Sequence, residues 1–218
     1  MHTVLLKDNN DVLIFGANKY GQLGLGNNYY QNKPVTLMQG IAIRQIACGG
    51  LHTVILQDDN DVLVFGRNHY GQLGLGHNDN QNKPITLMQG IYIRQIACGR
   101  YHTVILQDDN DVLVFGENDK GQLGLGHNRN QNKPVTLMQG IAVRQIACGD
   151  NHIVSLRAKA QTNLPLGTRS LLEKIRVSFL NKVILQDDND VLVFGANGYG
   201  QLGLEHNDDQ NKPMTLMQ

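Results

Sequence analysis

The sequence predicts an all-β protein built from about four repeated, four-stranded propeller blades. The first observation is an internal repeat of 50 residues, and the residues 51–100 and 101–150 differ at only nine positions. The second is that each repeat holds four short segments rich in β-branched and apolar residues, separated by turn-forming residues. Four short strands in about 50 residues, repeated along a chain, are typical of a propeller blade.

The repeat at 90–139 justifies each element in turn. Its four strands are expected over Ile91–Ala97, His102–Gln107, Asp111–Phe115 and Val135–Gln139. The second and third strands are joined by Asp108–Asn110, residue types that tolerate left-handed backbone and close tight turns. A long segment rich in Gly and Asn precedes the fourth strand and predicts a loop. Connections one and three of such an up-and-down sheet share one face of the molecule, which we call the loop face.

The chain is expected to be a single repeat domain with blades over about 1–39, 40–89, 90–139 and 140–218. An insertion at about 153–182 interrupts the last blade, because Val183 stands 79 positions after its counterpart Val104 and 29 residues are therefore extra. Within it, Ser170 lies three residues before Glu173, a capping-box pattern, and apolar residues follow at helical spacing. An amphipathic helix is expected over about 170–180.

The order of Ala-Cys-Gly, His-Thr-Val and Gly-Gln-Leu-Gly-Leu-Gly resembles the regulator of chromosome condensation repeat. The pattern covers Ala47–Gly76, Ala97–Gly126 and Ala147 onward, with partial copies at both ends. The family's frequent Trp in the third strand is replaced by Phe, and its Asp-Gly turn becomes Asp-Asn-Asp; both changes are physically mild. The resemblance implies a propeller of seven blades.

About four blades would make roughly half of such a ring. The alternatives are an open arc, a closed ring of four blades, and a partial ring that self-associates to complete itself. We expect an arc that self-associates or docks on a partner, because an open arc exposes two blade faces built for contact.

Several kinds of chemical site are disfavoured by the pattern. Each repeat supplies one Cys-His pair, such as Cys98 and His102, whereas structural zinc takes four protein ligands. We therefore expect no metal, with the cysteine as a small buried apolar group and the histidine hydrogen-bonded to the adjacent tight turn. The Gly-rich loop follows a strand and lacks the lysine of a phosphate loop, so an architectural role is expected. No catalytic constellation stands out, and no cofactor is expected.

Positions that differ between the repeats cluster in the two connections of the loop face, where a rigid scaffold commonly carries binding residues. Tyr and Arg among them suit protein recognition, whereas neutral drift of exposed loops is the alternative. The candidate partner-binding residues are Arg67, His69, Tyr70, Arg100, Tyr101, Glu117, Asp119, Lys120, Asp150 and Asn151.

The expected function is therefore that of a non-enzymatic interaction propeller that binds a protein partner through its loop face. The resemblance implies an alternative, guanine-nucleotide exchange on a small GTPase of the Ran type, although no motif of this chain matches the family's exchange element. A second alternative is contact of the insertion with chromatin or another anionic surface through Arg169, Lys174 and Arg176.

Charge and hydropathy bound these alternatives. The chain has 19 Lys and Arg against 19 Asp and Glu, which disfavours nucleic acid as a partner of the whole surface. The formal net charge of zero is the sum of +5 over residues 157–182 and −5 over the rest of the chain. Neither a signal peptide nor a membrane span is recognised, and three unpaired cysteines fit a reducing compartment, so a cytoplasmic or nuclear location is expected.

Overall fold

The computed structural model describes residues 1–139, 141–157, 191–199 and 201–217. Over these ranges the chain forms β-strands and no helix, which confirms the all-β class. The helix expected over about 170–180 lies outside the described residues, as do Arg169, Lys174 and Arg176. Among the described residues, no helix has the length and the apolar character that a membrane span requires.

The strands follow the repeat, three in the first unit and four in each later one. They are β1 (His2–Leu6), β2 (Val12–Gly16), β3 (Gln31–Met38), β4 (Ile43–Cys48), β5 (His52–Gln57), β6 (Val62–Gly66), β7 (Gln81–Met88), β8 (Ile93–Cys98), β9 (His102–Gln107), β10 (Val112–Gly116), β11 (Gln131–Met138), β12 (Val143–Cys148), β13 (His152–Arg157), β14 (Val191–Gly195) and β15 (Gln210–Met217).

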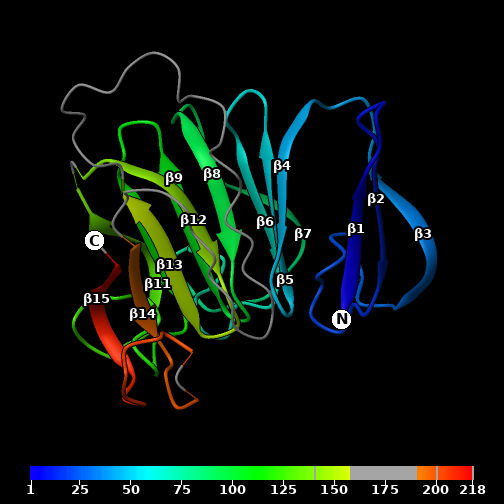
Figure 1. The fold of residues 1–218 in the computed structure, drawn as a ribbon. Helices are drawn as coiled ribbons and strands as arrows, with labels where there is room; N and C mark the ends of the chain where they lie inside the picture. The colour runs from blue at the N-terminus through cyan, green and yellow to red at the C-terminus, as the bar shows by residue number, and fades with distance from the viewer. Residues whose placement is uncertain (140, 158–190, 200, 218) are drawn as a thin grey trace.

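The strands pair into four antiparallel sheets of the expected up-and-down order: β1–β3, β4–β7, β8–β11 and β12–β15. We number these the first to fourth sheets. Their inner strands contact one another in chain order, β1 with β4, β4 with β8 and β8 with β12. Figure 1 shows the sheets following one another along an arc, with the first and fourth at opposite ends. A closed ring of four blades is therefore wrong for this chain.

The predicted strand boundaries of the repeat at 90–139 differ from the structure by at most two residues, except at the start of the fourth strand, where the difference is larger. The fourth strand of the third sheet, β11, begins at Gln131 and runs through Pro134, whereas the sequence places its start at Val135. β11 pairs only with β10 and lies at the outer edge of its sheet, where proline is tolerated because no further strand needs its missing N–H. The pairing register shifts between Val114 and Gly116, opposite this segment.

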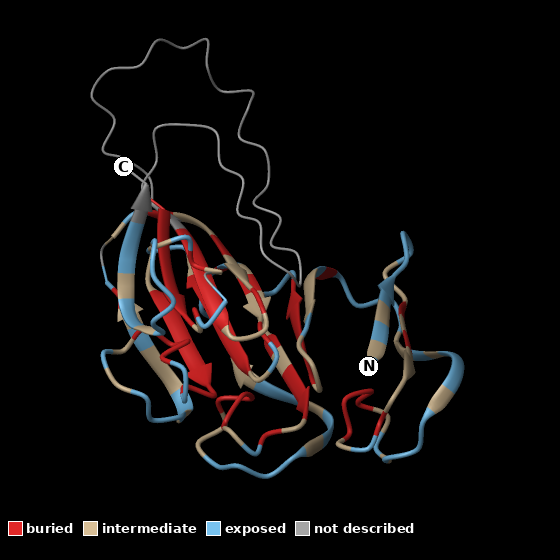
Figure 2. Ribbon diagram, turned by 60° about the horizontal axis from the view of Figure 1, so that its bottom comes forward, coloured by how far each residue is buried: buried red, intermediate tan, exposed pale blue. Residues whose placement is uncertain are grey.

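The core lies between neighbouring sheets. In the second and third sheets, Val54, Val64 and Ile96 pack with Phe115 in one buried cluster, and Phe115 is 0% exposed. Figure 2 shows the buried stretches in the middle strands, whereas the outer strands are largely exposed. Since each aromatic ring enters the neighbouring sheet, packing between sheets supplies much of the hydrophobic stabilisation.

Side-chain amides join the inner strands of adjacent sheets. The Gln45 Nε2 donates to the Ile96 carbonyl at 2.9 Å, and the Gln45 Oε1 accepts from the Ile96 backbone N–H at 2.9 Å. Gln95 makes the same pair of bonds with Ile146. A glutamine side chain thus takes the place of a backbone peptide group across each of these two junctions.

The repeated histidines make a second link between sheets. The His52 Nε2 lies 2.9 Å from the Thr103 Oγ1, and that hydroxyl donates to the Gln72 carbonyl at 2.8 Å. Since a hydroxyl has one proton to give, His52 is the donor to Thr103 and carries its hydrogen on Nε2. The expected bond between the histidine and its adjacent tight turn is made by the backbone, since the Gly49 N–H donates to the His52 carbonyl at 2.9 Å, whereas the His52 side chain bonds to the next sheet.

This link is missing at the last junction. Ile153 stands where the earlier repeats have Thr53 and Thr103. Both ring nitrogens of His102 are consequently buried without a hydrogen-bond partner, and the residue is 0% exposed.

The first sheet has an uncovered face. Leu5 of β1 is 45% exposed, whereas its counterparts Ile55 and Ile105 are 0% exposed. Thr3 is exposed, whereas Thr53 is buried and accepts a hydrogen bond from His2. In the later repeats, these positions are covered by the preceding sheet.

Candidate partner-binding surface

The loop face forms as the sequence predicts, because backbone hydrogen bonds join its two kinds of connection. The Arg67 N–H donates to the Leu51 carbonyl, and the Glu117 N–H donates to the Tyr101 carbonyl, each at 2.9 Å. The short connections are also joined to one another, since the Arg100 N–H donates to the Asp150 carbonyl at 2.9 Å. Residues far apart in the chain are thereby held side by side on one surface.

The long connections are held rigidly from within. The Asn118 Oδ1 accepts from the Leu123 N–H at 2.8 Å, and the Asn118 Nδ2 donates to the His127 carbonyl at 2.7 Å. Asn68 and Asn197 make the equivalent bonds in their own loops. These buried asparagines organise the Gly-rich loop from within, which agrees with the architectural role expected for it.

A cluster of tyrosines and arginines occupies the part of the loop face between the first and third sheets. The Arg67 guanidinium carbon lies 5.0 Å from the Tyr20 ring centroid, 5.3 Å from that of Tyr70 and 5.0 Å from that of Tyr101. The Arg100 guanidinium carbon also lies near this ring, 5.1 Å from the Tyr101 centroid. We call these five residues the tyrosine–arginine cluster. Its contacts are cation–π interactions, which orient the guanidinium planes.

Ring contacts complete this cluster. The Tyr70 and Tyr101 ring centroids are 5.2 Å apart, and His69 meets the edge of Tyr20 at 6.0 Å. Tyr20 is a site residue that the sequence reasoning missed. Tyr20 stands one repeat before Tyr70 at the same position, and this equivalence is the signal that could have identified it.

An acidic group borders the cluster. Glu117 is 9% exposed, and its carboxylate accepts a hydrogen bond from the Gln122 Nε2 at 3.1 Å. Burial and the neighbouring Asp119 raise the pKa of Glu117, against an opposing effect of Arg100 and Arg67. The loop face thus changes sign, from the arginines of the cluster to the carboxylates of Glu117 and Asp119.

The remaining predicted residues lie farther along the same face. Lys120 is exposed, and its Nζ lies 4.0 Å from a carboxylate oxygen of Asp209, across the junction with the fourth sheet. Asp150 is half-buried, and Asn151 accepts a backbone hydrogen bond from the Ala196 N–H at 2.8 Å. None of these three residues lies in the tyrosine–arginine cluster.

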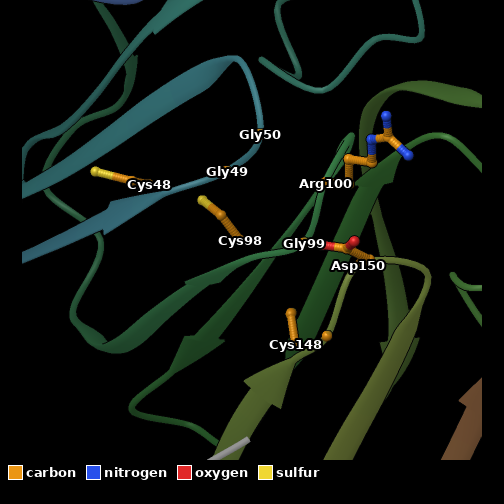
Figure 3. A pocket seen from close by; sticks show the side chains of 9 residues that line it. Cys48, Gly49, Gly50, Cys98, Gly99, Arg100, Cys148 and Asp150 are labelled. Carbon is orange, nitrogen blue, oxygen red and sulfur yellow. The ribbon is translucent and has the colours of Figure 1, made fainter. Parts of the chain in front are cut away.

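A small pocket of about 90 Å³ lies near the axis of the arc, lined by the repeated Cys-Gly segments together with Arg100 and Asp150 (Figure 3). Cys48 is exposed, so the expectation of a buried cysteine is wrong there; Cys98 and Cys148 are half-buried. Burial raises the pKa of the Cys98 and Cys148 thiols, which disfavours the thiolate that a metal requires. Within the described ranges, no group of three metal-ligating side chains comes together.

Comparison with known sequence families gives matches along most of the chain. The regulator of chromosome condensation (RCC1) repeat matches residues 9–56, 59–106, 109–156 and 188–218. A second RCC1 repeat family matches residues 43–72 and 93–122. A search of curated protein sequences returned no significant match.

The fold is also that of solved RCC1-type structures. The chain is similar to human WBSCR16, with a TM-score of 0.76 and 24% identity over 100% of this chain and 51% of that one. It is similar to Prp20p from Saccharomyces cerevisiae, with a TM-score of 0.74 and 21% identity over 100% of this chain and 48% of that one. The chain spans about half the length of these structures. Four repeat matches, which together cover well over half of the chain, show that the chain belongs to the regulator of chromosome condensation (RCC1) repeat family.

Proposed function

We propose that this RCC1-type propeller is a protein-interaction module that binds a partner through its loop face. The observation that supports it most is the tyrosine–arginine cluster, in which residues of three repeats converge on Arg67. Tyr and Arg carry a large part of the binding energy at many protein interfaces, and here their loops are held by internal hydrogen bonds. A partner would therefore meet a surface that loses little side-chain entropy on binding.

The test is partner capture with a charge-reversed loop face. We expect the variant Arg67→Glu, Arg100→Glu, Glu117→Lys to lose the proteins that the parent chain retains, because reversed charges oppose the complementary surface. Quantitative mass spectrometry of the captured proteins measures the loss. The matched control reverses Asp58 and Asp59 to lysine in the turn of the opposite face, where both side chains are exposed. Equal capture by the parent chain and the loop-face variant would rule out this surface.

Relatives supply a more specific candidate for the partner. Prp20p of Saccharomyces cerevisiae has binding properties to Gsp1p and histones, and yeast RCC1 (Prp20) has been crystallised with Kap60. That these relatives bind proteins, a small GTPase among them, is consistent with our proposal that this chain binds a protein partner. Exchange activity on a Ran-type GTPase, and contact of the insertion with an anionic surface, stay predictions.

We further propose that the 218-residue chain associates with a second copy through the uncovered face of its first sheet. The support is that Leu5 and Thr3 are exposed at positions where Ile55 and Thr53 are buried by a neighbouring sheet of the same kind. We expect a mass above that of the 24.2 kDa monomer in light scattering, and a return to the monomer in Leu5→Asp. A concentration-independent monomer in the parent chain would contradict this proposal.

A further inference from the structure

Four arginines of the described residues form two pairs with different surroundings. Arg94 donates from Nη1 to the Val143 carbonyl at 2.9 Å and from Nη2 to the Asp108 carbonyl at 2.8 Å. Arg44 makes the equivalent pair of bonds with Ile93 and Asp58. These two arginines are joined to the fold through their donors, and both lie at the turns opposite the loop face.

Arg67 and Arg100 differ from them. Their contacts are with tyrosine rings, and neither guanidinium reaches a carboxylate within 4.0 Å or donates a hydrogen bond among the residues that the structure describes. The Arg67 Nε is buried and has no hydrogen-bond partner. Because a guanidinium has five N–H donors and a ring face accepts none of them strongly, both groups keep their capacity to bind an anion.

The two guanidinium groups also share one support. Each lies about 5 Å from the Tyr101 centroid, at 5.0 and 5.1 Å. Glu117, an acid that acts on both of them through space, accepts a hydrogen bond from the Gln122 Nε2 at 3.1 Å and forms no ion pair with either. The two guanidinium groups therefore form no ion pair within 4.0 Å among the described residues, although the Glu117 carboxylate acts on both through space.

We propose that Arg67 and Arg100 form a clamp for a carboxylate side chain of the protein partner, held in position by Tyr101. This inference rests on the proposed function and adds the chemistry that the partner must present. A single carboxylate fits the site better than a polyphosphate chain, because Glu117 and Asp119 border the clamp and repel an extended anion. The partner segment therefore carries an acidic residue over the clamp and a neutral or basic one over Glu117.

The test uses fluorescein-labelled peptides that alternate glutamate with glycine, and a matched series with glutamine in place of glutamate. We expect the parent chain to bind the glutamate peptide more tightly than the glutamine peptide. The double variant Arg67→Gln, Arg100→Gln should weaken that binding about tenfold, since two charged hydrogen-bond donors are lost. Fluorescence anisotropy at low ionic strength measures both affinities, and circular dichroism checks that the variant is folded.

The matched control, Lys33→Gln with Arg129→Gln, removes the same charge from two exposed side chains outside the cluster and should retain the affinity. Tyr101→Leu retains both charges and should lose affinity, because the guanidinium groups are no longer held. Equal weakening by the control pair, or unchanged binding in the double variant or in Tyr101→Leu, would overturn the clamp. Tighter binding of a single-stranded oligonucleotide than of the glutamate peptide would assign the site to nucleic acid instead.

These outcomes are separable from the proposed function. If the charge-reversed loop face loses its captured proteins while the glutamine variants bind the acidic peptide normally, the loop face binds a partner without this clamp. If the peptide result holds and capture is unaffected, the clamp exists on a surface that the captured proteins do not use.

Discussion

Gly71→Ala is expected to destabilise the protein by about 3–5 kcal/mol, a large part of the stability of an ordinary domain. A Cβ at this position would lie 2.4 Å from the Asn132 Cα and 2.7 Å from the Gln131 carbonyl oxygen, both backbone atoms of the next sheet. The backbone φ of +82° adds strain for any residue with a side chain. Since neither atom can move without shifting β11, the second and third sheets must separate.

Gly90→Ala is the matched control for this effect. Its φ of +71° gives a similar backbone strain, but no atom lies within 4 Å of the added Cβ. We expect a loss of about 1 kcal/mol there, from the left-handed backbone alone. Urea unfolding followed by circular dichroism measures both. Equal losses in the two variants would show that the close approach between sheets contributes nothing.

Acidification below pH 6.5 is expected to destabilise the protein, because its inter-sheet histidines are buried in the neutral form. Burial lowers the pKa of His52 to about 3 and that of His102 to about 3, from 6.5, with smaller repulsion from neighbouring histidines. A proton added to His52 would go to Nδ1, since Nε2 already donates to Thr103, and the buried Nδ1 has no partner to accept it.

The direction in which stability changes with pH follows from the difference in proton binding between the folded and unfolded chain. Between pH 6.5 and about pH 3, the unfolded chain binds protons on these histidines that the folded chain does not, so stability is lost as the pH falls. The loss approaches about 1.4 kcal/mol per pH unit for each histidine. We expect the urea midpoint to drop steeply between pH 6.5 and pH 4.5.

Two variants test whether the buried histidines cause this dependence of stability on pH. His52→Gln should be less stable at neutral pH, yet its stability should depend less on pH by the equivalent of one proton. His206→Gln should leave the slope unchanged, because the His206 side chain is 41% exposed. A midpoint that stays constant between pH 7 and pH 5 in the parent chain would contradict the account.

The elements that the sequence predicts correctly are those with a local signal. His102–Gln107 is predicted to the residue, because its β-branched residues are bounded by a Gly-containing connection and an acidic turn. The shared loop face follows from up-and-down topology alone. By contrast, β11 starts before Pro134, because its place at the sheet edge removes the usual penalty for proline and no local pattern reveals an edge.

The candidate site could be predicted only in part. Arg67, Tyr70, Arg100 and Tyr101 are found because their positions vary between repeats, whereas Tyr20, at the position of Tyr70, is passed over although the same comparison contains it. The partner of each histidine could not be found either, since Thr103 lies 51 residues from His52 and the bond depends on how two sheets pack. Distances across a junction are a tertiary property that periodicity does not contain.

Ile153, which leaves His102 without a partner, makes the junction between the third and fourth sheets unlike those before it. A nearly periodic array unfolds in steps where the coupling between neighbouring units is weakest. We therefore expect the fourth sheet to detach as a cooperative unit before the second and third sheets separate, so that amides of β12 and β13 exchange with solvent deuterium before those of β5 and β9. One missing hydroxyl would thus set the order in which the array opens.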